Sequence, residues 1–133
     1  MYLVDTNVWL ERLLDQARSD EVGHFLDHVP TERLFITDFA FHSIGVVLTR
    51  LNQLEALLHF VRDVFIDGAV GLIHLEPGDT ERLVRVTEQF DLDFDDAYQY
   101  VAAEKYNLAV VSFDSDFDHT ERGRKTPVEV LQG

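Results

Sequence analysis

The sequence predicts an α/β fold, a three-layer α/β/α sandwich built around a mostly parallel sheet. Short apolar and β-branched runs alternate along the chain with longer segments of helical periodicity, as is typical of a parallel sheet covered by helices. The run Leu108–Val111 is apolar throughout, which is expected of a strand buried on both faces. With 133 residues, 46% of them hydrophobic, the chain is long enough for one core. We therefore expect a single domain over residues 1–133.

The first half of the chain carries start and stop signals for four helices. Residues that commonly cap helices stand before the helical segments, and Pro30 ends the second helix. Residues 52–55 have the form of a capping box and open the fourth helix. The predicted elements are strand Tyr2–Val4, helix Val8–Asp15 capped by Thr6 or Asn7, helix Ser19–His28 capped by Ser19, strand Leu34–Ile36, a helix from Thr37 or Asp38 to about Leu51, and a helix from Asn52 to Ile66.

The second half repeats the alternation. Asn107 is suited to the left-handed conformation that ends a helix, and the segment 121–125 reads as a loosely held tail. The predicted elements are strand Val70–Leu75, a turn at Pro77–Asp79, helix Thr80–Phe90 with Leu83, Val84 and Val86 facing inward, helix Asp95–Tyr106, and strand Leu108–Val111.

Composition limits the classes of function and location. Asp and Glu number 25 against 11 Lys and Arg, a formal net charge of −14, which opposes non-specific binding to a polyanion. The chain has no cysteine, so disulfides, thiol nucleophiles and thiolate zinc sites are excluded. We read no signal peptide after Met1 and no membrane span, because Asp38 and His42 interrupt the longest apolar stretch, Leu34–Leu48. These features favour a cytoplasmic protein.

Three acidic residues follow segments that read as strand ends. Asp5 follows the first strand, Asp96 follows residues 93–95, and Asp114 lies just past the last strand. Ligands bind beyond the carboxyl ends of parallel strands, where Asp5 and Asp114 are expected. Carboxylates gathered there repel by about 4 kcal/mol per pair at 4 Å, so the cluster needs protons or a cation. Mg²⁺ or Mn²⁺ fits such oxygen ligands.

Each of these acids also has a purely structural explanation. Asp5 can cap a helix, Asp96 can stabilise the first turn of a helix through the macrodipole, and Asp114 can belong to an acidic turn. Only the coincidence of all three favours a metal site.

The residues around these acids resemble the signature blocks of PIN domains. The blocks are Asp5–Val8 at the N-terminus, Asp96–Ala97 opening a helix rich in small residues, and Val110–Phe117 near the end. The resemblance covers nearly the whole chain. A free-standing domain of this length is similar to the toxin ribonucleases of VapBC toxin–antitoxin pairs.

The resemblance implies a site, an activity and partners. A PIN domain at these positions would have an acidic pocket that binds Mg²⁺ or Mn²⁺ and hydrolyses RNA phosphodiester bonds. Asp5, Asp96 and Asp114 would be the catalytic, metal-binding acids, and Asp116 would be a further metal ligand. The implied partners are an RNA substrate, a cognate antitoxin protein and a second copy of the chain in a homodimer.

The sequence departs from the PIN pattern at one position. PIN domains usually carry a glutamate on the helix after the second strand, about six residues beyond a Ser or Thr. In this sequence Thr37 is that residue, and the expected glutamate position is occupied by Ser43, with His42 beside it. Asp38 and Glu11 are the candidate replacements, and His42 is a candidate polar or basic group. Without a replacement the site favours one tightly bound ion over two. The alternative is a catalytically degenerate PIN-like module that acts by binding a protein or RNA partner.

Further residues are candidates for supporting roles. Cations would contact RNA phosphates, and aromatic side chains would stack on unpaired bases. We expect Trp9 and Phe113 to pack in the core instead, because large aromatics dominate cores. His24 and His28 do not make a zinc site without a third ligand. The candidates are Asp93, Asp95 and Asp118 for the field around the site, Arg12, Arg50, Arg122, Arg124 and Lys125 for phosphates, and Tyr98, Trp9 and Phe113 for bases.

Overall fold

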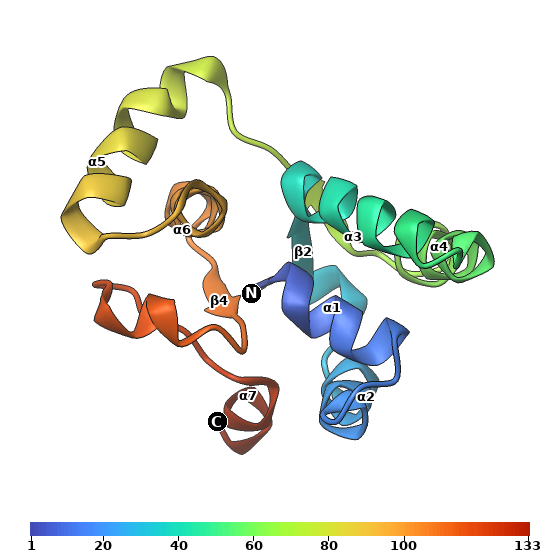
Figure 1. Ribbon diagram of the computed structural model, residues 1–133. Coiled ribbons are helices and arrows are strands. Elements are labelled where there is room, and N and C mark those ends of the chain that lie inside the picture. The colour runs from blue at the N-terminus through green and yellow to red at the C-terminus, as the bar shows by residue number, and fades with distance from the viewer.

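The computed structural model describes residues 1–133 and contains a four-stranded sheet with helices on both faces (Figure 1). Its strands are β1 (Tyr2–Val4), β2 (Leu34–Thr37), β3 (Gly71–Ile73) and β4 (Ala109–Val111), in the order β3-β2-β1-β4. All three strand pairs are parallel. Parallel neighbours require crossover connections, and the helices between the strands supply them. The predicted α/β/α sandwich is confirmed.

The two faces of the sheet carry two separate hydrophobic cores, because successive side chains of a strand point to opposite faces. Val4 and Val111 belong to one core, and Leu3 and Val110 belong to the other. Each of these four side chains is at most 3% exposed. Strands β1 and β4 are therefore buried on both sides, although β4 is the last strand in the order, which explains their continuous apolar sequence.

Two groups of helices cover these cores, and Figure 1 shows them on opposite sides of the sheet. No helix combines the length and apolar character needed to cross a membrane. The first group is α1 (Thr6–Leu13), α2 (Ser19–His28), α3 (Asp38–Arg50), α4 (Leu54–Val61) and α7 (Pro127–Gln132), and the second is α5 (Thr80–Phe90) and α6 (Phe94–Tyr106).

Most predicted elements are confirmed to within two residues at each end. α5 spans the predicted residues, and the predicted turn at Pro77–Asp79 is a 3-10 turn. Asn107 ends α6 with φ 55°, the left-handed conformation predicted for it. Thr37 caps α3 by accepting a hydrogen bond from the backbone N–H of Ala40.

Four details of the predicted helix ends are wrong. α1 begins at Thr6 rather than Val8, because the Asp5 carboxylate accepts from the Thr6 N–H and caps the helix. Ser19 is the first residue of α2 and not its cap. The predicted capping box at 52–55 is absent, since Asn52 turns the chain with φ 57°. The fourth helix is α-helical only to Val61 and continues as a π-helical turn at residues 62–66.

Two further predictions are corrected in the second half. Val84 is 51% exposed, so only Leu83 and Val86 of the predicted inward set are buried. The segment 121–125 is not a loose tail. Lys125 forms a parallel bridge with Val111, donating its N–H to the Val110 carbonyl at 2.8 Å. The helix α7 that follows was not predicted, although its capping box, Thr126 with Glu129 after a proline, is visible in the sequence.

Candidate metal centre

Asp5, Asp96 and Asp114 line one pocket of about 280 Å³. Asp5 follows β1 and Asp114 follows β4, and these strands are neighbours with Val4 opposite Val111. Both acids therefore lie at the carboxyl edge of the sheet, as predicted. Asp96 does not follow a strand, which corrects the interpretation of residues 93–95, and comes instead from the first turn of α6. The other lining residues are Thr6, Asn7, Leu10, Phe39, Ser43 and Asp95.

Asp5 is held by four hydrogen-bond donors and is only 7% exposed. Its Oδ1 accepts from the Gln99 side-chain amide and from the Thr6 N–H, both at 2.9 Å. Its Oδ2 accepts from the Ser112 hydroxyl at 2.8 Å and, at 3.4 Å, from Asn7 Nδ2. Burial raises the pKa of Asp5, and the hydrogen bonds from Gln99 and Ser112 oppose that rise. The carboxylate is thus fixed in orientation.

Gln99 connects Asp5 to the start of α3, and sequence reasoning missed it. Its amide oxygen accepts from the Thr37 hydroxyl at 2.7 Å, while its amide nitrogen donates to Asp5. Gln99 is 1% exposed, so this link lies fully inside the protein. A signal was present in the sequence, because Gln99 stands three residues after Asp96, a spacing that places both on one helix face.

Ser112 and Asn7 join the segment after β4 to α1. The Ser112 hydroxyl accepts from the Asp114 N–H at 2.9 Å as well as donating to Asp5. Asn7 donates to the Ser112 hydroxyl at 3.1 Å and accepts from the Phe113 N–H at 3.1 Å. These bonds set the position of the Asp114 backbone relative to Asp5. Both residues lie inside the blocks that resemble PIN domains, although no role was assigned to them.

Asp96 is a buried acid with an unsatisfied oxygen. It is 8% exposed, and its Oδ2 has no hydrogen-bond partner. Burial raises the pKa of Asp96 to about 8, with further contributions from the charges of Asp114, Asp93 and Asp5. Asp93 caps α6 by accepting from the Asp96 N–H at 2.9 Å, so the cap is the neighbour and not Asp96 itself.

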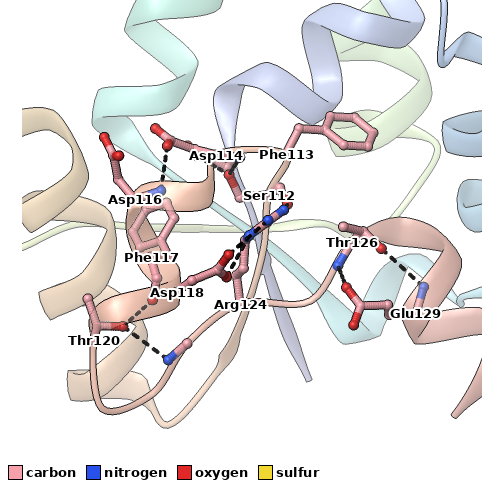
Figure 2. A network of polar contacts seen from close by, with 12 residues as sticks. Ser112, Phe113, Asp114, Asp116, Phe117, Asp118, Thr120, Arg124, Thr126 and Glu129 are labelled. Carbon is pink, nitrogen blue, oxygen red and sulfur yellow. Dashed lines mark hydrogen bonds and ion pairs between the residues drawn. The ribbon is translucent and has the colours of Figure 1, made fainter.

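Asp114 and Asp116 lie together after β4, with the Asp116 N–H donating to Asp114 Oδ1 at 2.8 Å (Figure 2). One carboxylate oxygen from each of Asp96, Asp114 and Asp116 lies within 4.8 Å of the others. Asp116 is exposed and stands outside the lining of the pocket. Of the predicted ligands, three surround the pocket and Asp116 lies beside Asp96 and Asp114 at its rim.

The position of the missing glutamate lies at this pocket. Ser43 is among its lining residues, whereas neither candidate replacement is. The Asp38 carboxylate accepts instead from the Tyr98 hydroxyl at 2.8 Å. Glu11 is half-buried away from the pocket, with Oε2 unpaired, and His42 lines a groove between α3 and α4. The pocket therefore offers the carboxylates of Asp5, Asp95, Asp96 and Asp114 and a hydroxyl at residue 43.

The predicted supporting residues divide between site and scaffold. Asp95 lines the pocket, but Asp118 is paired with Arg124 at 2.9 Å (Figure 2). Trp9 is 2% exposed and packs edge-on against Phe60, so it is a core residue as expected. Phe113 is half-buried, packs on the same core and carries the Arg18 guanidinium 4.7 Å above its ring.

Residues 2–123 match the PIN domain in a comparison with known protein families. This chain belongs to the PIN domain family. The match includes all three acidic blocks and the position of Ser43. No curated protein sequence matches the chain.

Solved structures of similar fold include a toxin–antitoxin complex and a toxin. A toxin–antitoxin complex from Klebsiella pneumoniae has 19% identity and a TM-score of 0.76, with 96% of this chain and 98% of that chain covered. The sarcin-ricin loop cleaving toxin VapC20 of Mycobacterium tuberculosis has 17% identity and a TM-score of 0.77, covering 92% and 96%. FitAcB from Neisseria gonorrhoeae has 20% identity and a TM-score of 0.73, covering 96% and 99%. At these identities the likeness shows a shared PIN fold.

The pocket of this PIN domain suits a hard divalent cation. Its charged groups are all carboxylates, the ligand class that Mg²⁺ and Mn²⁺ take. Two of its lining residues hold buried polar atoms without partners, Asp96 Oδ2 and the Thr6 hydroxyl. A cation would satisfy the first and offset both the burial and the repulsion between carboxylates that raise the pKa of Asp96.

Proposed function

We propose that the chain is a Mg²⁺- or Mn²⁺-dependent endoribonuclease and the toxin component of a toxin–antitoxin pair. The observation that carries the proposal is the unpaired, buried Asp96 oxygen in a pocket shared with Asp5 and Asp114. A buried carboxylate without a donor is costly unless a proton or a cation accompanies it. The PIN family assignment favours the cation.

Asp5, Asp96 and Asp114 would hold the cation. When bound, it would lower the pKa of an attacking water and offset charge developing on the phosphate. Asp5 contributes a carboxylate fixed by Gln99 and Ser112, which keeps the site from rearranging as the substrate enters. Asp96 contributes an oxygen that no protein group uses. The position of Asp114 is set by the hydrogen bond that its backbone N–H donates to the Ser112 hydroxyl.

The proposed biological setting follows the relatives. A toxin–antitoxin complex and a sarcin-ricin loop cleaving toxin are among the structures with this fold. For this chain we propose an RNA substrate, a cognate antitoxin that restrains it, a homodimeric state and a cytoplasmic location, with residues 1–133 acting as one domain.

The direct test is cleavage of a generic single-stranded RNA by purified protein. Wild type should cleave with Mn²⁺ or Mg²⁺ and stop with chelator. Asp5→Asn and Asp114→Asn should lose activity by about two orders of magnitude or more, because each removes a ligand charge. Glu88→Gln, at an exposed acid on α5, is the matched control and should stay active. Equal cleavage by wild type and Asp114→Asn would show that the activity does not arise from this pocket.

A second candidate function is a degenerate PIN module that binds a protein or RNA partner without cleavage. Ser43 favours it, because the usual glutamate position lies at the pocket with no carboxylate. Ser43→Glu tests this point, and we expect it to tighten Mn²⁺ binding and raise cleavage several-fold, since a further carboxylate favours a second ion. Ser43→Gln, of similar size without the charge, is the control. Inactivity of the wild type and of Ser43→Glu, with folded protein in both cases, would reject the nuclease and leave the binding module.

A further inference from the structure

The acidic pocket has no cation in its own wall. None of its nine lining residues is Lys, Arg or His. Four of the 11 cations of the chain are already paired with carboxylates elsewhere, in Arg82–Glu104, Arg85–Glu81, Lys105–Asp79 and Arg124–Asp118. Contacts with phosphates normally supply much of the affinity for a nucleic acid, and a chain of net charge −14 is poorly equipped for them. A substrate RNA needs another source of affinity here.

A row of three aromatic rings runs outward from the pocket. Phe39 lines the pocket, and its ring centroid lies 5.8 Å from that of Tyr98. Tyr98 in turn lies 6.4 Å from Phe94. Phe94 is the first residue of α6, two positions before Asp96, and is 59% exposed. The outer end of the row therefore presents an aromatic ring to solvent at the start of α6, the helix that carries Asp96.

The middle ring is held in place by the hydrogen bonds of its hydroxyl group. The Tyr98 hydroxyl donates to the Asp38 carboxylate at 2.8 Å and accepts from the Leu75 N–H at 3.0 Å. The same Asp38 oxygen accepts from the Phe39 N–H at 2.8 Å. Asp38 therefore connects Tyr98 to the start of α3. The Phe94 ring packs against a tyrosine ring whose hydroxyl makes two hydrogen bonds.

We propose that Phe94 is a stacking platform for an unpaired base of a single-stranded RNA substrate. The inference rests on the proposed nuclease function and adds a residue that would contact its RNA substrate. Stacking on an aromatic ring contributes affinity without neutralising phosphates, which suits a site that lacks cations.

Charge argues for a base over other occupants of this surface. Exposed carboxylates flank Phe94 at Asp93 and Asp95, so a phosphate group is repelled there, whereas the face of a base carries no charge. A second copy of the chain, which also has a net charge of −14, would be repelled by this acidic part of the surface.

The first test places a fluorescent reporter in the platform. Phe94→Trp adds an exposed indole to a chain whose single tryptophan, Trp9, is 2% exposed. Single-stranded RNA should quench the introduced indole, and an abasic ribose-phosphate oligomer of equal length should not. Val84→Trp, at an exposed site on α5, is the control and should stay unquenched. Equal quenching by the abasic oligomer, or none by RNA that binds, would overturn the proposal.

The second test measures affinity by fluorescence anisotropy. Ca²⁺, which binds to the same kind of oxygen ligands, replaces Mn²⁺ or Mg²⁺, and the RNA is checked afterwards to show that it is intact. Phe94→Ala and Phe94→Leu should each weaken binding of single-stranded RNA by roughly 5- to 100-fold, and Phe94→Tyr should retain it. Retained affinity in Phe94→Leu would mean a general apolar contact and overturn stacking. Loss of a dimer in Phe94→Ala, with RNA affinity per chain unchanged, would assign the surface to a second copy instead.

The two proposals fail in different ways. A wild type that cleaves RNA while all Phe94 variants bind it equally well contradicts only the stacking platform. A wild type that neither binds nor cleaves any RNA contradicts the nuclease, and the platform with it.

Discussion

Asp96 shows most clearly how a single residue distinguishes a site from a scaffold. An acid in the first turn of a helix has an ordinary explanation in the macrodipole. Yet it is the Asp93 carboxylate that caps α6, by accepting a hydrogen bond from the Asp96 N–H. The Asp96 carboxylate is buried beside Asp114 and has one oxygen unpaired. Burial and the neighbouring carboxylates raise the pKa of Asp96 to about 8, so its ionised form opposes folding. A buried carboxylate with these neighbours is better explained as a ligand to a cation than as a residue that stabilises the helix.

A prediction at this scale concerns Asp96→Asn in chelator. A carboxyl group with a higher pKa in the folded state destabilises that state above the unfolded pKa, and here the loss accumulates as pH rises from about 4 to about 8. Asp96→Asn removes this cost, while the lost macrodipole contact and solvent at the pocket mouth reduce the gain. We expect Asp96→Asn to be more stable by about 1–3 kcal/mol at pH 8, with the difference shrinking toward pH 4. Denaturant unfolding at several pH values measures it. A variant less stable than wild type at pH 8 would restore the helix-terminal explanation.

At the scale of elements, α6 organises the site. Ala97, Ala102 and Ala103 of this helix are fully buried, and their small side chains let it lie close to the sheet. That close approach brings Asp96 to the pocket and lets Gln99 reach both Asp5 and Thr37. The low amphipathic character of α6, which is buried along much of its length, follows from this position between sheet and α5.

The corresponding prediction is that Gln99→Met costs stability although the site keeps all its acids. The substitution preserves volume but leaves the Thr37 hydroxyl without its acceptor and removes one of the four donors to Asp5. We expect the free energy of unfolding to fall by about 1–3 kcal/mol. Gln89→Met, at an exposed glutamine of α5, is the matched control and should change stability by less than about 0.5 kcal/mol. Denaturant unfolding at neutral pH compares them. Equal losses in the two variants would mean that the buried link does not hold Asp5.

Elements were predictable where local pattern and tertiary packing agree. The strands and α5 follow from apolar runs and periodicity, and the end of α6 follows from Asn107. The failures arise where tertiary contacts override local signals. Val84 fits an inward stripe by hydropathy alone, but only one side of α5 meets the core. The polar segment 121–125 looks loose until Lys125 adds its backbone to β4.

At the scale of the whole molecule, topology explains why the acids could be predicted and their partners could not. Parallel strands bring their carboxyl ends to one edge, so Asp5 and Asp114 were expected to meet. The roles of Gln99 and Ser43 depend on how α6 and α3 pack on the sheet, and periodicity along the sequence does not specify that. The net charge of −14 also acts at this scale, since under our proposals a cation in the pocket and base stacking would be the means by which a polyanion is held.

The most direct measurement of the central claim is the melting temperature of the protein with and without millimolar Mn²⁺. A cation that binds only the folded state at a hundredfold excess over Kd adds about 2.7 kcal/mol, which for a chain of this size is a rise of roughly 8–13 °C. Wild type and Glu88→Gln should show this rise, and Asp114→Asn should lose most of it. A wild type unchanged by Mn²⁺, or an equal rise in Asp114→Asn, would contradict a cation site at Asp5, Asp96 and Asp114.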